Sequence, residues 1–291
     1  MTDDDDDAYA ATLREAIAHL ASHDPTCARF GARHHRYLTG PRLDDARLAA
    51  IEAEVGIRLP DDYRAHLRTI GDGGAGPYHG LMPLDHPLQL AAARGAFALR
   101  DTTATVDAPR GPALYQGVVG LAHLGCGYVA FLVVAGPARG QVWLDGRGAD
   151  DGVRPIVTGD GAFRAFFHEW IDALAHARWP RGWVTPGRCA LPSALTAYLR
   201  AVEQRLGLAD GALAGDALRE ALDDIPDGGI AVADGGDTPF FASGDQVDLC
   251  VVCEQTLENL VPQGMRRAQV QPGVAPIPMR DRAPWAAASV P

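Results

Sequence analysis

The segment from Leu59 to Leu84, LPDDYRAHLRTIGDGGAGPYHGLMPL, constrains the fold more than any other part of this 291-residue chain. Asp61 and Asp62 follow a proline and favour the positive end of a helix dipole, so they predict a helix start. The expected buried stripe of that helix consists of Tyr63, Leu67 and Ile70. Gly71 would end the helix, and the glycine-dense residues 72–77 predict a tight turn that returns the chain into an apolar strand.

Two further helices are predicted upstream of this segment. Apolar residues recur at helical spacing between Tyr9 and Leu20, whereas residues 1–7 form an acidic tail that we expect to be disordered. Asp44 is placed to cap a second helix that runs to about Val55. Gly56 would then adopt the left-handed conformation that commonly ends a helix.

The pattern changes to strands from about residue 113. Candidate strands are Val118–His123, Tyr128–Ala135, Gln141–Asp145 and Val153–Val157. The second is a continuous apolar run, typical of a strand that is buried on both faces. The helix predicted over Ala162–Ala175 carries a wide apolar stripe, and we expect it to pack on the sheet. The stripe consists of Phe163, Phe166, Phe167, Trp170, Ile171 and Leu174.

Less pattern is visible in the C-terminal part. Residues 179–190 resemble a linker, and helices are predicted over about Leu195–Leu206 and Asp216–Asp224. Ile230–Ala233 and Gln246–Cys253 read as strands. The last 28 residues, 264–291, contain five prolines and no periodicity, so they predict an irregular tail.

Charge and composition exclude several functions. The net charge is −11, and residues 191–263 hold 13 acidic residues against 3 arginines. This balance argues against nucleic acid, and it suits either a basic protein partner or simple solubility. The chain has no lysine, which excludes a Walker A loop and Schiff-base chemistry. The acidic start and the short longest apolar run predict a cytoplasmic protein without a membrane span.

Several of these pieces, in their order, resemble the SUKH superfamily, which includes fungal Smi/Knr-like regulators and bacterial immunity proteins. The E-x-x-x-G-I-x-L-P-x-x-Y-R-x-x-L pattern from Glu52 to Leu67 is similar to the family's opening helices. Further matching pieces are Arg29 to Ala32, His35 to Tyr37, Gly125 to Gly127, Gly140 to Asp145, and the helix around Phe163 to Trp170. The resemblance covers residues 27–178.

The resemblance implies an α+β fold, with a mostly antiparallel curved sheet and helices packed on one side. It also implies a non-enzymatic protein-binding role, either as an immunity protein that neutralises a polymorphic toxin or as an intracellular scaffold. The domains expected are 1–26 (acidic tail and helix), 27–178 (SUKH-like), 179–190 (linker), 191–263 (acidic region or small second domain) and 264–291 (tail). No cofactor is expected.

Candidate partner-binding residues fall into three groups. Tyr78 and His79 are the residues of the opening segment that could contact a partner. Trp143, Asp145 and Arg147 would line a groove if the sheet had an open face, although Trp143 could instead pack under the last helix of the domain. The acids of the C-terminal region could face a basic toxin surface, or could simply be a solvated helix face. These acids are Asp216, Glu220, Asp223, Asp224 and Asp227.

Signals for catalysis or metal binding are weak. Cys250 and Cys253 form a CxxC without the second pair that a zinc ribbon needs. His34 and His35, with His19 and His23, lack an accompanying carboxylate pattern. Cys126 lies near His123 in sequence, but a catalytic cysteine needs an aligned base, and structural burial is the interpretation we favour. We therefore expect no catalytic residue and no metal site.

Overall fold

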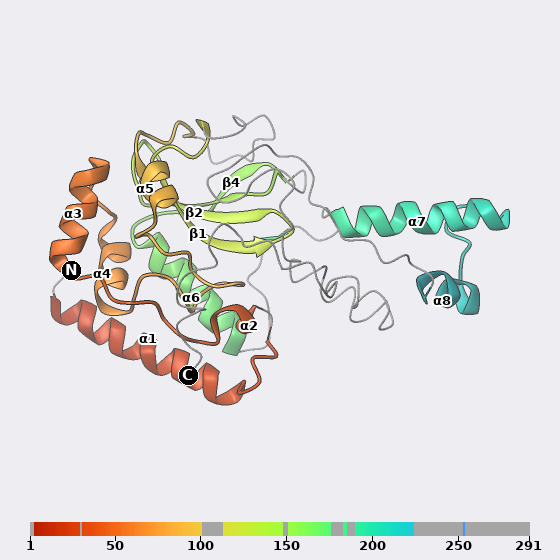
Figure 1. Ribbon diagram of the computed structural model, residues 1–291, viewed down its shortest axis with the longest axis horizontal. Coiled ribbons are helices and arrows are strands. Elements are labelled where there is room, and N and C mark those ends of the chain that lie inside the picture. Colours follow the sequence, from red (N-terminus) through yellow and green to blue (C-terminus); the bar gives the residue numbers. More distant parts are fainter. Residues whose placement is uncertain are drawn as a thin grey trace.

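The computed structural model describes residues 3–29, 31–100, 113–147, 151–175, 183–184, 190–223 and 253. Its centre is a four-stranded antiparallel sheet with helices packed on one face (Figure 1). The strands follow one another in sequence order: β1 Val118–Gly125, β2 Tyr128–Val133, β3 Val142–Asp145 and β4 Val153–Val157. Register shifts interrupt β1 twice and the β3–β4 pairing once, and such irregularities bend a sheet. The predicted α+β fold with a curved sheet is confirmed.

Along the described chain, five helices precede the sheet and three follow it. They are α1 Asp3–His23, α2 Ala32–His35, α3 Asp45–Val55, α4 Asp61–Thr69, α5 Pro87–Ala93, α6 Ala162–Ala175, α7 Ala190–Leu206 and α8 Gly215–Asp223. The Asp44 side chain caps α3 by accepting a hydrogen bond from the Arg47 amide at 2.7 Å. Gly56 ends that helix in the left-handed region, at φ 73°, as the sequence predicts.

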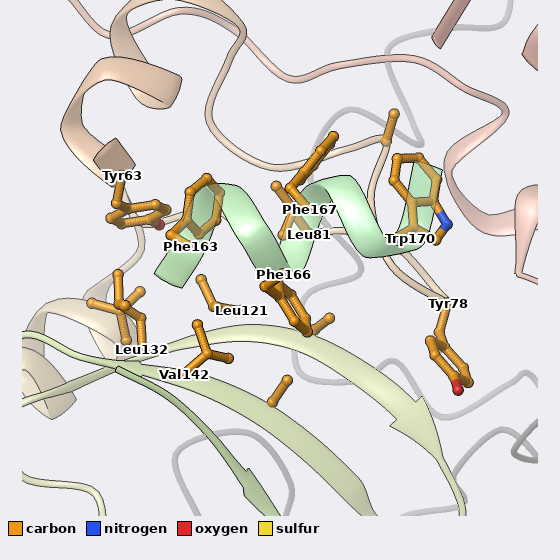
Figure 2. Close-up of a cluster of buried hydrophobic side chains, with 14 of the residues drawn as sticks. Tyr63, Tyr78, Leu81, Leu121, Leu132, Val142, Phe163, Phe166, Phe167 and Trp170 are labelled. Atoms are coloured by element: carbon orange, nitrogen blue, oxygen red, sulfur yellow. The ribbon is translucent and has the colours of Figure 1, made fainter. Parts of the chain in front are cut away.

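Helix α6 covers one face of the sheet. Its side chains Phe163, Phe166 and Phe167 are completely buried. Figure 2 shows Phe163 and Phe166 between the helix and the strand residues Leu121, Leu132 and Val142. The aromatic stripe predicted from the sequence thus packs α6 on the sheet, and burial of apolar area on this scale is the dominant stabilising contribution to folding.

The opposite face of the sheet is also covered. Trp143 and Phe131 point to that side, where Phe97 meets them edge to face at ring distances of 5.0 and 5.5 Å. Tyr115 closes the same cluster beside Phe131. Strands β1, β2 and β3 are therefore buried on both faces, whereas β4 at the edge of the sheet is only partly buried. This burial explains why β2 reads as a continuous apolar run.

The glycine-dense turn after α4 continues the sheet beyond β1. Isolated bridges connect Thr39 to Gly74, Gly74 to Leu81, and Leu81 to Ala122 of β1. Gly74 has a φ of 89°, and a Cβ at this position would lie 2.4 Å from the Leu38 carbonyl oxygen. Only glycine allows this approach, so the turn serves backbone geometry, as we expected.

The acidic N-terminus differs from the prediction of a disordered tail, because α1 already begins at Asp3. Asp6 is 8% exposed and accepts hydrogen bonds from Arg164 at 2.5 Å and Arg68 at 3.3 Å. The Arg164 guanidinium also lies 4.1 Å from the centroid of the Tyr9 ring. Two arginines on α4 and α6 thus hold the start of α1, and aspartates are favourable at a helix N-terminus.

Asp62 has a further role that the sequence did not indicate. Its buried carboxylate accepts hydrogen bonds from the Tyr63 amide at 2.9 Å and from the Arg164 amide at 3.2 Å. The second donor belongs to the first turn of α6, whose amides lack partners within the helix. Asp62 therefore joins the start of α4 to the start of α6.

In the C-terminal part the structure describes α7 and α8, which extend away from the sheet (Figure 1). Both helices were predicted, and Gly207 ends α7 at φ 67°. Within the expected linker, Trp183 is buried and stacks on Phe166 at 4.5 Å, so this position belongs to the core. The strand expected at Ile230–Ala233 and the tail 264–291 lie outside the described residues. Of the strand expected at Gln246–Cys253 the structure describes Cys253, which is helical, so the prediction is wrong at this residue.

Candidate partner-binding site

Tyr78 and His79, the first candidate pair, are buried side chains. Tyr78 is 3% exposed and stacks on Trp183 at a ring distance of 6.0 Å. His79 is 9% exposed, stacks on His123 at 5.5 Å and meets His34 edge to face at 4.5 Å. Both side chains therefore face the interior, and in this conformation neither offers a surface to a partner.

Trp143 is also a core residue. It is 1% exposed, and its indole nitrogen donates a hydrogen bond to the Gln141 side chain at 3.0 Å. The expected groove is not open at this position, because Phe97 covers the indole. The alternative of packing under α6 is wrong as well, since Trp143 points to the opposite face of the sheet.

Asp145 and Arg147 form a closed ion pair at the end of β3. Asp145 accepts hydrogen bonds from the Arg147 amide at 3.0 Å and from its guanidinium at 2.7 and 2.9 Å. The Tyr115 hydroxyl donates to the same carboxylate, and burial raises the pKa of that tyrosine well above its usual value. The carboxylate and the guanidinium thus bind each other in a largely buried position. We therefore interpret this ion pair as a structural contact that stabilises the end of β3.

The acids of α8 are the candidates that lie on the surface. The Asp216 side chain is 95% exposed and pairs with Arg219 at 2.9 Å, and Glu220 one turn further on is also exposed. Asp223 is the last residue of α8, and Asp224 and Asp227 lie outside the described residues. Among the described candidate residues, Asp216 and Glu220 are the charged side chains in the exposed class, whereas Arg147 is partly buried.

Helix α8 is fixed to α7 by specific contacts. Buried Glu203 accepts a hydrogen bond from the Leu213 amide at 2.9 Å, and backbone donors of this turn lower the pKa of its carboxyl. Tyr198 donates to the Ala221 carbonyl at 3.0 Å. Val202, Leu213 and Ala221 form a small apolar cluster between the two helices. We call residues 190–223 the α7–α8 arm.

A row of three histidine rings was not predicted as a unit. The His34 ring contacts the His79 ring, and the His79 ring contacts the His123 ring. His79 and His123 belong to segments that are distant in sequence, and the bridge between Leu81 and Ala122 places these segments together. Among the residues that the structure describes, no group of three or more His, Cys, Asp or Glu side chains is arranged to hold a metal ion. The described ring geometry is that of aromatic packing.

Buried ionisable groups inside the domain have strongly shifted pKa values. Burial lowers the pKa of His35 and of His66 to about 3. His66 lies between the rings of Phe163 and Phe167, at 5.0 and 4.9 Å. Burial raises the pKa of Asp72 to about 6, although its carboxylate accepts hydrogen bonds from the Leu84 and Asp85 amides. His35, His66 and Asp72 are therefore buried core residues, surrounded by packed helix and turn segments.

Comparison with known families identifies the domain. Residues 42–158 match the SMI1 / KNR4 family (SUKH-1), and the chain therefore carries a domain of this family. The matched range is shorter than residues 27–178, the range that the resemblance covers in the sequence. Helices α1, α2 and α6 lie outside the matched range, but their side chains pack in the same apolar core. No curated protein and no solved structure matches the chain.

Membership of this family is consistent with a protein-binding module of the immunity type. Helices α1 to α8, as far as the structure describes them, include none that is both long and apolar enough to cross a membrane.

Proposed function

We propose that this protein is a non-enzymatic binding module, an immunity protein that neutralises a polymorphic toxin by covering the toxin's working surface. The observation that carries the proposal is the match of residues 42–158 to the SUKH-1 family. A nuclease toxin suits the charge, because nucleases bind phosphates with basic surfaces and this chain carries a net charge of −11. Such a protein acts in the cytoplasm of the cell that makes the toxin.

The α7–α8 arm is the surface that we assign to partner binding. Support comes from the contrast in exposure: the Asp216 side chain is 95% exposed, whereas Tyr78 and Trp143 are 3% and 1% exposed. Carboxylates on an exposed helix can occupy the phosphate-binding positions of a basic partner, which speeds encounter and fixes orientation. The arm also projects from the domain, where a partner can reach it (Figure 1).

Co-expression with toxin genes from the same locus tests the proposal. The expected result is capture of one toxin domain in a pull-down and survival of cells that otherwise die when the toxin is induced. If the protein neither binds nor protects against any neighbouring toxin, the immunity role is wrong. A locus without a toxin gene would favour the second candidate, an intracellular scaffold of the Smi/Knr type, which the same family match supports.

A further inference from the structure

Two cysteines that are far apart in sequence meet in the core. The Cys126 and Cys253 sulfur atoms are 3.6 Å apart, across a sequence separation of 127 residues. Their side chains are 8% and 0% exposed, and both belong to the main apolar cluster. A disulfide has a sulfur–sulfur distance of about 2.05 Å, so an approach of about 1.5 Å would join these atoms.

The backbone around Cys126 fixes the direction of this side chain. Gly125, Cys126 and Gly127 all have positive φ, at 85°, 51° and 81°, in the turn between β1 and β2. The pairing of Gly125 with Tyr128 closes the hairpin around this turn. A non-glycine residue in the left-handed region persists only where its surroundings hold it in place. Cys126 is thus held by the hairpin itself, with its sulfur beside that of Cys253.

We propose that Cys126 and Cys253 form a disulfide when the protein meets hydrogen peroxide, and that this bond fastens the C-terminal region to the β1–β2 turn. Cys126 reacts first, because it is the more exposed of the two. Its thiol sulfur attacks one peroxide oxygen, which gives a sulfenic acid and releases one water. The Cys253 sulfur then attacks the Cys126 sulfur, the sulfur–oxygen bond breaks, and a second water leaves.

The two thiols together lose two electrons, which reduce one peroxide to two waters. The new bond would close a long loop, and a cross-link across a long loop restricts the unfolded chain strongly. The bond would therefore hold residue 253 beside the sheet even when the rest of the core loosens. This inference does not depend on toxin binding, and the two can fail separately.

Peroxide treatment of the full-length protein, followed by alkylation of the remaining thiols and peptide mass spectrometry, tests the proposal. The expected product is a peptide pair that joins residues 126 and 253, lighter than the two reduced peptides by two hydrogen atoms and separated by dithiothreitol. The oxidised protein should also unfold at a higher temperature than the reduced protein. The Cys253→Ser variant should lose both effects, whereas Cys27→Ser, at a half-buried cysteine, should keep them.

A peroxide product that joins Cys253 to Cys250, or full alkylation of Cys126 after treatment, would overturn the proposal. The peptide analysis of the unsubstituted protein decides the question by itself if a serine variant fails to fold.

Discussion

The domain and the α7–α8 arm differ in how much apolar surface they bury. In the domain, α6 and both faces of the sheet enclose an apolar core in which Phe163, Phe166 and Trp143 are almost completely buried. In the arm, the apolar cluster of its own consists of Val202, Leu213 and Ala221, while Leu222 of α8 belongs to the main core. More apolar area is thus buried in the domain, and the free energy of burial scales with apolar area.

Their acidic residues differ in the same way. Asp6, Asp62 and Asp72 of the domain are buried and hold backbone amides or arginines. On the arm, Asp216 and Glu220 are exposed, whereas Glu203 is buried and supports the turn at Leu213. A count of acids therefore says little about function, since the buried ones build the fold and cannot contact a partner.

The largest effect should come from the core under α6. Phe166→Ala removes a fully buried ring that stacks on Trp183 at 4.5 Å, and we expect a loss of about 3–5 kcal/mol in the free energy of unfolding. Val202→Ala in the arm, which removes two buried methyl groups, should cost about 1–2 kcal/mol. Chemical denaturation monitored by circular dichroism measures both. Equal losses would contradict the claim that the two regions differ in scale.

Acid should destabilise the domain through its buried histidines. The unfolded chain binds protons on His35 and His66 below about pH 6.5, whereas the folded protein binds them only near pH 3, so stability falls as the pH drops. Asp72 has the opposite sign, because its raised pKa lets the folded protein take up a proton between about pH 6 and 4. The net loss between pH 7 and pH 5 should be about 2–3 kcal/mol.

His66→Leu removes one of these two groups while the opposing contribution of Asp72 remains, so the acid loss in denaturation curves recorded from pH 7 to pH 5 should fall below about 1 kcal/mol. His23→Leu, at an exposed position near the end of α1, is the matched control and should leave the pH dependence as it is. An unchanged slope in the His66→Leu variant would show that other groups cause the acid sensitivity.

The start of α1 should depend on Asp6 and not on its neighbours. Asp6→Asn removes the charge that Arg164 and Arg68 share, with an expected cost of about 2 kcal/mol, because hydrogen bonds to charged groups contribute more than neutral ones. Asp7→Asn, at an exposed position, should change the free energy of unfolding by less than about 0.5 kcal/mol. If both changes cost the same, the acidic run would act through its overall charge and not through one buried contact.

The elements that were predicted well depend on local patterns. The helix over 162–175 has the bounds that its aromatic spacing predicts, and the strands over 118–157 lie within two residues of the expected ends. Asp44 and Gly56 mark their helix because capping is decided within a few residues. Such helices and strands can be predicted from the local sequence, and tertiary contacts then stabilise them further.

Contacts between distant segments could not be read in the same way. Alternation along β3 places Trp143 and Asp145 on one face, but it does not say that Phe97 and Tyr115 cover that face. His79 meets His123 only because the turn after α4 bridges to β1. The run of aspartates at the N-terminus looked unstructured because its partners, Arg68 and Arg164, lie 62 and 158 residues away from Asp6.

Charge reversal on the arm should produce the smallest change in stability and the most informative change in binding. The double variant Asp216→Arg, Glu220→Arg alters exposed side chains of α8. Its control, Asp45→Arg, Asp61→Arg, changes the net charge by the same amount at exposed acids of α3 and α4, where Asp61 pairs with Arg58 as Asp216 pairs with Arg219. Neither should change the free energy of unfolding by more than about 1 kcal/mol.

The decisive measurement is the affinity of these two variants for the captured toxin domain, determined by titration calorimetry. It tests whether the α7–α8 arm binds the partner while the domain supplies stability. We expect the α8 variant to bind about tenfold or more weakly and the α3–α4 variant to stay within about twofold of the unsubstituted protein. Equal weakening in both, or a larger loss in the α3–α4 variant, would contradict it.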